Sequence, residues 1–343
     1  MGLVRVMLAI AVVLFHSGTT LFSMKLIDGF SAVMLFFIIS GFYMALILNG
    51  KYNSYGAFLT NRFLKLYPVY WVVLALAWMS PSTPFAGLSG SALAYWLFAN
   101  IFVVGSHLTS VIINTPEGFG LLPFGRQIAA PEMTWGRLYI GPVWSISVEI
   151  LFYLVAPLLV AAKGRFAKMA FMFAVSAVAY IYLRVHESAF IPWTYNFLLP
   201  TLYLFALGAV AWNIYDSERF KQFYTVRKAA LAYTLMLAYV LLHVEYMTYV
   251  GLPLFGSGEI ANLVGALVFM LCLPFAFELT AKSSIDRHIG DLSYPIYLSH
   301  TLVLQHAPWA AGLNPLVTTI GMSVLLSYGV MKPIDRYRAA RVK

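Results

Sequence analysis

Hydrophobic positions form long continuous runs along this chain, with short polar stretches between them. Lipid offers no hydrogen-bond partners, so each crossing must be a helix of about 20 apolar residues or part of a closed barrel. The runs lack the alternation of a barrel strand, and the pattern therefore predicts an all-α, polytopic transmembrane helical bundle. The ten predicted spans are residues 3–23, 29–48, 62–80, 141–162, 168–185, 195–214, 229–247, 259–279, 291–310 and 314–332.

An eleventh apolar stretch, near residues 91–109, is ambiguous, and the distribution of basic residues helps to interpret it. Lysine and arginine cluster in alternate connections, which the positive-inside rule assigns to the cytoplasm. This pattern requires an even number of spans with both termini cytoplasmic, and it places residues 81–139 outside the cell membrane. The stretch 91–109 is then an interfacial or re-entrant segment. We predict ten spans, with eleven as the alternative, in a single membrane-embedded domain over residues 1–343.

The composition supports a membrane protein. Of 343 residues, 61% are hydrophobic and 10% are charged, against about 25% charged in soluble domains. The mean hydropathy is +0.81. These values exclude a soluble enzyme, a disordered chain and a fibrous protein, and they favour topology over nucleic-acid binding as the reason for the excess of 22 basic over 13 acidic residues. A single cysteine and the absence of an H-x3-H pair predict no metal site.

Ionisable residues inside spans are functional candidates because each costs a few kcal/mol in the bilayer. Arg5 and His16 are eleven positions apart in the first span, so a helix places them on one face, roughly 16 Å apart. Arg5 would lie at the cytoplasmic edge and His16 near the middle of the membrane. Imidazole is well suited to proton transfer near neutral pH. The alternative is an arginine that reaches the interface and an unrelated buried histidine.

Two further groups lie in the third and fourth spans. Arg62 and Lys65 share a helix face at the cytoplasmic end, where they could bind a phosphate-bearing ligand, although a plain positive-inside anchor fits the charge equally well. Ser145, Glu149 and Tyr153 follow at intervals of four and line one face. A lone buried glutamate needs a partner or a proton. Glu149 is therefore either a catalytic or ligand-orienting group or part of a structural polar clamp.

The last two groups suggest packing more than chemistry. Tyr294 and Tyr297 share a helix face with His300 nearby, and an aromatic stripe of this kind usually packs. Ser40 and Gly41 belong to a phenylalanine-rich segment of the second span, where the glycine predicts a close approach of another helix.

Together these pieces resemble the acyltransferase-3 family of integral-membrane acyltransferases, which includes bacterial O-antigen and Nod-factor O-acetyltransferases. The matches follow the family's order along almost the whole chain. They are R-x10-H at Arg5 and His16, the S-G-F segment at 36–42, R-x-x-R at Arg62 and Lys65, W-S-L-x-x-E-x-x-F-Y at 144–153 and S-Y-x-x-Y-L-x-H at 293–300. Lys65 departs from the family's second arginine, and lysine is a point charge without the planar fork of arginine.

The resemblance implies transfer of an acyl group, usually acetyl, from cytoplasmic acyl-CoA to a hydroxyl of a glycan or glycolipid. His16 would act as general base or carry the acyl group transiently, and Glu149 would orient His16 or activate the acceptor. The donor would contact Arg5, Arg62 and Lys65. The remaining candidates would support substrate or structure: Ser40, Ser145, Tyr153, Tyr294, Tyr297 and His300.

The expected partners are the lipid bilayer, acyl-CoA as a donor substrate and a cell-envelope acceptor, with no tightly bound cofactor and no nucleic acid. The family resemblance implies the bacterial inner membrane as the location. A secondary transporter is the main alternative, although the sequence lacks the inverted symmetry typical of that class. A non-catalytic membrane scaffold is a third interpretation. The sequence leaves open the acceptor and the choice between direct transfer and an acyl-enzyme.

Overall fold

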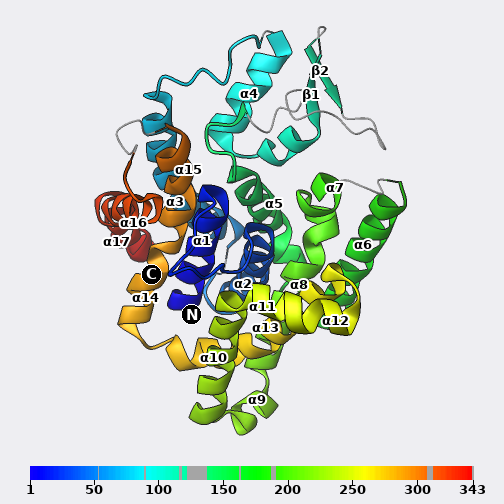
Figure 1. Cartoon of the computed structure of the whole chain (residues 1–343). Coiled ribbons are helices and arrows are strands. Elements are labelled where there is room, and N and C mark those ends of the chain that lie inside the picture. Colours follow the sequence, from blue (N-terminus) through cyan, green and yellow to red (C-terminus); the bar gives the residue numbers. More distant parts are fainter. Residues whose placement is uncertain are drawn as a thin grey trace. The chain divides into compact units, whose positions relative to one another are not determined.

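The computed structural model describes residues 1–52, 54–88, 90–115, 118–121, 137–161, 164–186, 191–306 and 312–341. Helices dominate these residues (Figure 1). They are α1 (Gly2–Ser17), α2 (Gly29–Gly50), α3 (Tyr55–Trp78), α4 (Gly90–Phe102), α5 (Val143–Leu159), α6 (Arg165–His186), α7 (Ile191–Tyr195), α8 (Leu198–Asp216), α9 (Glu218–Phe223), α10 (Val226–Leu241), α11 (His243–Tyr246), α12 (Leu252–Phe255), α13 (Gly258–Thr280), α14 (Ser284–Asp291), α15 (Ser293–Thr301), α16 (Pro315–Leu326) and α17 (Lys332–Arg341).

The described residues also contain one antiparallel hairpin and four short irregular helical turns. The hairpin pairs β1 (Ile112–Thr115) with β2 (Gly118–Leu121). One is the 3-10 turn η1 at Ser106–Ser110. The other three are π-helical turns at Met247–Gly251, Leu302–His306 and Ser327–Met331. The prediction of an all-helical membrane protein is therefore confirmed in its main feature, with a small hairpin that the apolar pattern did not indicate.

Several helices are long and apolar enough to cross a membrane. Five meet this criterion outright: Gly29–Gly50, Arg165–His186, Trp193–Asp216, Gly258–Thr280 and Pro315–Arg338. A sixth candidate is Val226–Leu241 with His243–Leu254, which bend by 82° at their junction. Each of the ten predicted spans overlaps a helix, but the number ten is not confirmed. The helix α4, in the ambiguous stretch 91–109, has 13 residues and is shorter than the roughly 20 needed to span alone.

The first predicted span was too long at its carboxyl end. We predicted residues 3–23, whereas α1 ends at Ser17 after 16 residues. Gly18 has a φ of 64° and its amide bonds back to the Leu14 carbonyl. A glycine in this left-handed conformation is a common helix terminator, because it has no side chain to clash.

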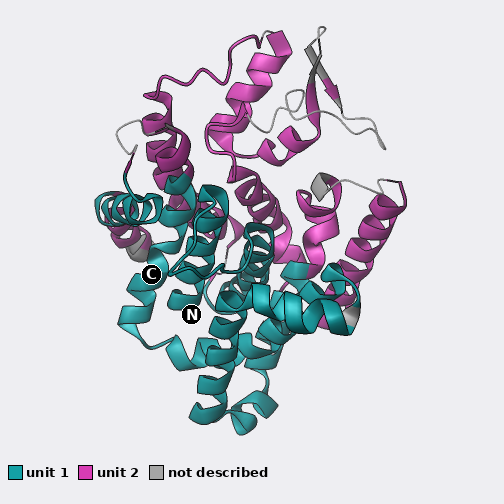
Figure 2. Cartoon of the chain, in the orientation of Figure 1, with its two compact units in different colours: residues 1–51, 204–300, 313–329 teal, residues 52–203, 301–312, 330–343 magenta. Residues whose placement is uncertain are grey.

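The chain divides into two compact units, each built from segments far apart in sequence (Figure 2). Unit 1 contains residues 1–51, 204–300 and 313–329. Within it, α1 packs against α2, α10, α14 and α16. Val6, Ala9 and Val13 of α1 form a buried cluster with Ile296 of α15. The helix that carries Arg5 and His16 is thus surrounded by other helices of its unit.

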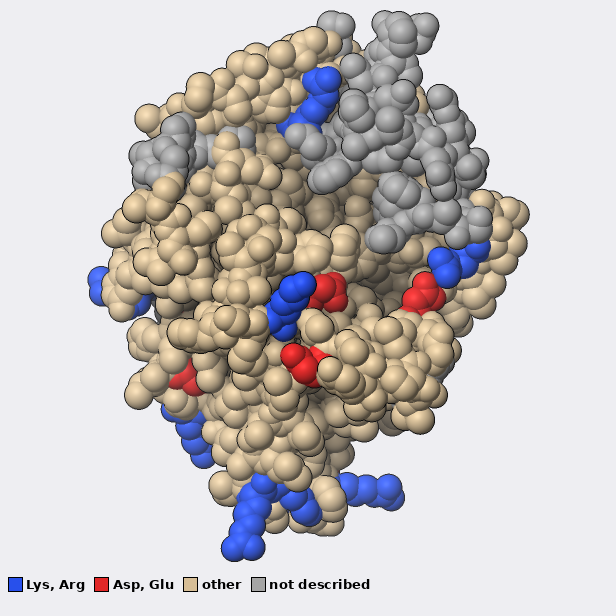
Figure 3. Space-filling view, in the orientation of Figure 1, with Lys and Arg blue, Asp and Glu red and all other residues tan. Residues whose placement is uncertain are grey.

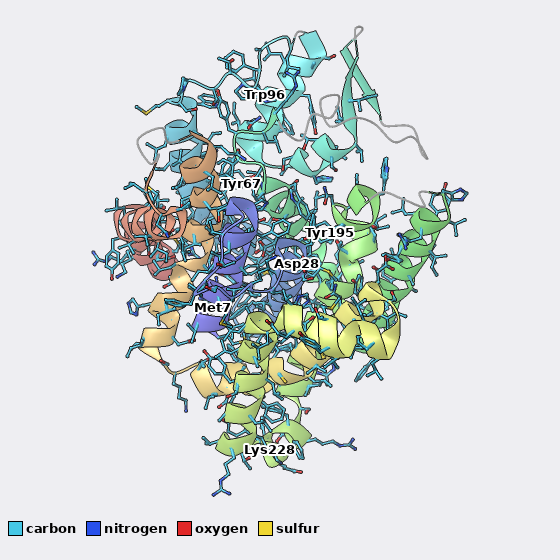
Figure 4. The ribbon with its side chains drawn as sticks, in the orientation of Figure 1. Met7, Asp28, Tyr67, Trp96, Tyr195 and Lys228 are labelled. Carbon is cyan, nitrogen blue, oxygen red and sulfur yellow. The ribbon has the colours of Figure 1, made fainter. Side chains whose placement is uncertain are left out.

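Unit 1 also carries exposed basic side chains around α9 and the start of α10. Arg219, Lys221, Arg227 and Lys228 are all exposed, and Figure 3 shows basic side chains gathered at this end of the chain's surface. Lys228, labelled in Figure 4, donates to the Phe223 carbonyl at 2.8 Å. The positive-inside rule predicts that this end faces the cytoplasm.

Unit 2 contains residues 52–203, 301–312 and 330–343. Its helix α3 packs against α5 and α17, and its tyrosines bind the end of α4. Tyr67, labelled in Figure 4, donates to the Phe102 carbonyl at 2.5 Å, and Tyr70 donates to the Asn100 carbonyl. The buried Asn100 accepts from the Tyr139 amide at 3.1 Å. Residues 89, 116–117 and 122–136 of the predicted outer segment 81–139 lie outside the described residues.

The predicted close packing at Gly41 is confirmed. A Cβ placed on Gly41 would lie 2.1 Å from the Phe205 carbonyl oxygen, and one placed on Gly208 would lie 2.1 Å from the Ile38 carbonyl oxygen. Small residues that allow two backbones to approach in this way are the usual basis of close helix packing in membranes. The segment 36–42 therefore holds α2 directly against α8.

We predict that Gly41→Ala destabilises the folded protein by about 1–3 kcal/mol, because the added methyl group overlaps backbone atoms that cannot move aside. Thermal unfolding of the detergent-solubilised protein measures the effect. Gly50→Ala in the same helix is the matched control, since a Cβ there meets nothing within 4 Å. Equal melting temperatures for the two variants would contradict the packing argument.

Candidate functional site

The helix that carries Arg5 and His16 is anchored at its first turn by Asp286 of α14. The amide of Gly2 donates to Asp286 Oδ2 at 2.6 Å, and the amide of Leu3 donates to Oδ1 at 3.1 Å. The first amides of a helix have no partners within the helix and carry partial positive charge, so a carboxylate at this position satisfies them. A Cβ on Gly2 would lie 1.7 Å from the Asp286 carbonyl oxygen. Only glycine fits here.

The same contacts determine the protonation of Asp286, which belongs to the polar connection before α15. Burial raises the pKa of this carboxyl. Hydrogen bonds from the Met1 amino group and from the Gly2 and Leu3 amides lower it further than burial raises it, so the pKa lies below the ordinary value of 3.8. The carboxylate is therefore ionised over the physiological range.

Arg5 lies one turn into α1, close to the end of α14. Its Nη1 would be 3.6 Å from a Cβ placed on Gly290, and its side chain is partly exposed. Within the part of the chain that the structure describes, the guanidinium makes no hydrogen bond or ion pair. An arginine with all its donors available can bind an anionic group.

His16 contacts His300. The spacing of residues in the sequence did not predict this contact. The two rings stack with centroids 5.0 Å apart and an interplanar angle of 24°. His300 Nε2 lies 3.2 Å from His16 Nδ1. The His300 side chain is fully buried, whereas His16 is exposed. Of the predicted site residues, these two are brought together in unit 1.

The neighbouring carbonyls determine which ring nitrogens carry hydrogen. His300 Nδ1 lies 2.7 Å from the Tyr297 carbonyl oxygen, and His16 Nδ1 lies 3.0 Å from that of Val12. A carbonyl only accepts, so each neutral ring holds its proton on Nδ1. His300 Nε2 then accepts from His16 Nδ1. It follows that His16 Nε2 is an unprotonated nitrogen, and it has no hydrogen bond among the described residues.

Among the other predicted residues of α15 and α2, Tyr297 contacts this histidine pair. Tyr297 is 7% exposed, and its ring meets the rings of His300 and Phe36 edge-on, at 5.9 and 6.4 Å. Ser40 is buried in α2, and Tyr294 is partly buried in α15. The aromatic stripe thus combines packing with one specific task, since the Tyr297 backbone orients His300.

Unit 2 brings together Arg62, Glu149 and Tyr153. The Tyr153 hydroxyl donates to Glu149 Oε1 at 2.5 Å, one helical turn away on α5. The Arg62 guanidinium lies over the Tyr153 ring, 6.0 Å from its centroid. Lys65, also on α3, is partly buried. Glu149 therefore has the partner that a carboxylate in an apolar helix needs. The approach of Glu149 to His16 stays a prediction.

The motif that contains Glu149 also holds a pair that sequence reasoning missed. Ser147 Oγ lies 2.8 Å from His107 Nδ1 and accepts from the Gly105 amide at 3.0 Å. Ser147 is fully buried and His107 is 8% exposed. Ser145, predicted as a support residue, bonds to the Pro142 carbonyl at 3.1 Å. Ser145 thus bonds the backbone at the start of α5, whereas Ser147 holds Gly105 and His107 of the η1 segment. The burial of both serines indicates a structural role.

The fold and these contacts define a multi-span membrane protein whose helices carry a histidine pair in unit 1 and a group of Arg62, Glu149 and Tyr153 in unit 2. Residues 1–329 match the family model described as an acyltransferase domain, and the chain belongs to the acyltransferase-3 family of membrane acyltransferases. It is 25% identical over 305 residues to nodulation protein 10 of Rhizobium leguminosarum bv. viciae, covering 84% of this chain and 75% of that protein. No solved structure gave a significant match.

We predict that Asp286→Ala lowers the stability of the folded protein by about 1–2 kcal/mol at neutral pH, because the first amides of α1 lose their acceptor. A carboxyl whose pKa is lowered by folding stabilises the folded state fully above its ordinary pKa of 3.8. This stabilisation is lost as the pH falls through the pKa that the carboxyl has in the folded protein. The difference in melting temperature between wild type and variant should therefore shrink as the pH falls below about 4. Asp291→Ala is the control, and a pH-independent difference would contradict the assignment.

Proposed function

We propose that this protein is a membrane O-acyltransferase that moves an acyl group, expected to be acetyl, from acyl-CoA to a hydroxyl of a cell-envelope glycan, lipid-linked saccharide or related acceptor. Family membership supports acyl transfer in a membrane. The ordered motifs from Arg5 to His300 support the more specific reaction. The observation that carries the proposal is the open Nε2 of His16.

The hydrogen bonds of His16 suit it to act as a general base. A base must present a lone pair to the proton that it removes, and the Val12 carbonyl and His300 both engage Nδ1, leaving Nε2 available. His300 is a positioning residue in this proposal: it holds the ring of His16 and its tautomer, as a fixed acceptor does in other histidine-dependent enzymes. The buried His300 is in turn held by the Tyr297 carbonyl.

The proposed reaction is direct transfer. His16 Nε2 takes the proton of the acceptor hydroxyl while the oxygen attacks the thioester carbonyl carbon. The carbon–sulfur bond then breaks, and the CoA thiolate takes the proton back from the imidazolium. The products are the acyl ester and free CoA, and His16 returns to its neutral form. An acyl group found covalently on His16 would replace this route with an acyl-enzyme.

The basic residues are proposed to bind the donor. Arg5, Arg62 and Lys65 lie near the ends of spans that the positive-inside rule places at the cytoplasm, where acyl-CoA is found. Charge-assisted hydrogen bonds from arginine are the strongest common interaction with phosphate. Glu149, held by Tyr153, is proposed to orient or activate a reacting group. The outer segment 81–139 is proposed to contact the acceptor, since loops commonly carry recognition, and the proposed location is the bacterial inner membrane.

We predict that His16→Ala reduces acyl transfer from labelled acetyl-CoA by at least about 100-fold, the usual contribution of a general base. Binding of CoA should be unchanged. The assay uses purified protein in nanodiscs with an envelope lipid extract as acceptor. His288→Ala is the matched control, because this histidine is exposed on α14 of the same unit.

Unchanged transfer by a well-folded His16→Ala protein would remove the catalytic assignment. His300→Ala separates positioning from folding: we expect a lower kcat with an unchanged KM for acetyl-CoA. Transport of a solute without any turnover of acyl-CoA by the wild type would instead favour a secondary transporter.

We predict that Glu149→Gln lowers transfer by about 100-fold, because the amide cannot take a proton or stabilise positive charge. Tyr153→Phe removes the hydrogen bond to Glu149 and should cost roughly tenfold, the scale of a hydrogen bond to a charged group. Tyr55→Phe, whose hydroxyl bonds only a backbone carbonyl of α5 in the described residues, is the control. Full activity of Glu149→Gln would contradict the proposed role.

A further inference from the structure

The tail helix α17 places an arginine beside Arg62. Arg338 Nη2 donates to Asn61 Oδ1 at 2.5 Å, and Arg62 Nη2 donates to the same oxygen at 3.2 Å. The two guanidinium groups therefore share one acceptor, and α17 packs along α3 within unit 2. No spacing in the sequence pointed to this partner of Arg62.

Both arginines are partly buried, and neither has all its donors hydrogen-bonded. The Arg338 side chain is 12% exposed. The Nε atoms of Arg62 and Arg338 are both buried without a hydrogen-bond partner. A buried donor on a charged group that lacks an acceptor is costly, and native structures seldom leave one without a reason. Two such donors on adjacent arginines are suited to a shared anionic ligand.

The charges around Arg62 and Arg338 also favour an anionic ligand. Asp335 forms an ion pair with Arg338 through Nη1, and Asn61 is a neutral acceptor. The two guanidinium groups are close enough to repel each other. Of the carboxylates that the structure describes in this region, Asp335 is engaged by Arg338 Nη1 and Glu149 by the Tyr153 hydroxyl, so an added anion would relieve the repulsion between the two guanidinium groups. Phosphate oxygens accept from Nε and Nη together in the bidentate geometry that arginine favours.

We propose that Arg338 and Arg62 form a two-arginine phosphate site that holds a phosphate of the acyl donor. This proposal rests on the proposed function, since it assigns the donor's phosphate to particular residues.

The test compares ligands with and without phosphate groups. Full-length protein in nanodiscs of phosphatidylcholine is titrated with CoA and with pantetheine, which lacks the phosphates, and the ratio of the two affinities measures phosphate selectivity. In Arg338→Ala this ratio should fall by about tenfold or more, the scale of a charge-assisted hydrogen bond. Arg338→Lys should recover part of it. Arg336→Ala, on the same helix and exposed, should leave it unchanged.

A purely structural Arg338 would alter stability and leave the ratio intact, and that result in Arg338→Ala or Arg338→Lys overturns the proposal. Should Arg338→Ala fail to fold, Arg338→Lys still tests the proposal, because lysine keeps the positive charge but lacks the planar guanidinium. A second arm measures phosphatidylglycerol retained by each purified variant. Loss of that lipid with an unchanged ratio keeps the phosphate site but overturns its assignment to the donor.

The two proposals can fail separately. A wild type that binds CoA no better than pantetheine contradicts acyl-CoA as donor, and the lipid arm then decides the phosphate site alone. A wild type that prefers CoA by a margin unaffected at Arg338 leaves the proposed function standing and overturns the assignment of the donor's phosphate to the two arginines. Absence of any effect in both arms removes the site.

Discussion

A lipid-embedded helix can carry a polar side chain only if the protein itself supplies a partner, because the bilayer core has no water to replace one. This constraint organises both units of the chain. His300 binds the Tyr297 carbonyl and His16, Glu149 binds Tyr153, and Asn61 accepts from two arginines. Polar atoms left without a partner stand out against this background. Among the described residues they include the Nε atoms of Arg62 and Arg338 and the Nε2 of His16.

Much of the fold follows from the sequence because helix formation in a membrane is a local matter. Each apolar run that was predicted to span the membrane overlaps a helix of the structure. Gly41 predicted the close approach of a second backbone. Arg5 and His16 lie on one continuous helix, as their spacing required. The exact length of α1 was missed because the left-handed Gly18 ends it, and an apolar run does not reveal where a glycine will turn.

The contacts between distant segments could not be predicted in the same way. His16 and His300 are separated by 284 positions, and no periodicity relates them. Asp286 was hidden in a short polar connection, although the glycine at position 2 is a faint signal that something approaches that helix end. Arg338 was hidden among other basic residues, where charge alone suggested topology. In each case the deciding fact is a tertiary contact, which depends on how helices pack and not on their own sequence.

Acyl transfer to an envelope molecule is the claim on which the interpretation of these contacts depends. Mass spectrometry of the surface glycans and lipids of cells with and without this protein tests it most directly. The account predicts one or more species that carry an added acyl group, most simply acetyl, only when the protein is present. Identical glycan and lipid profiles, with the protein correctly inserted and abundant in the membrane, would contradict it.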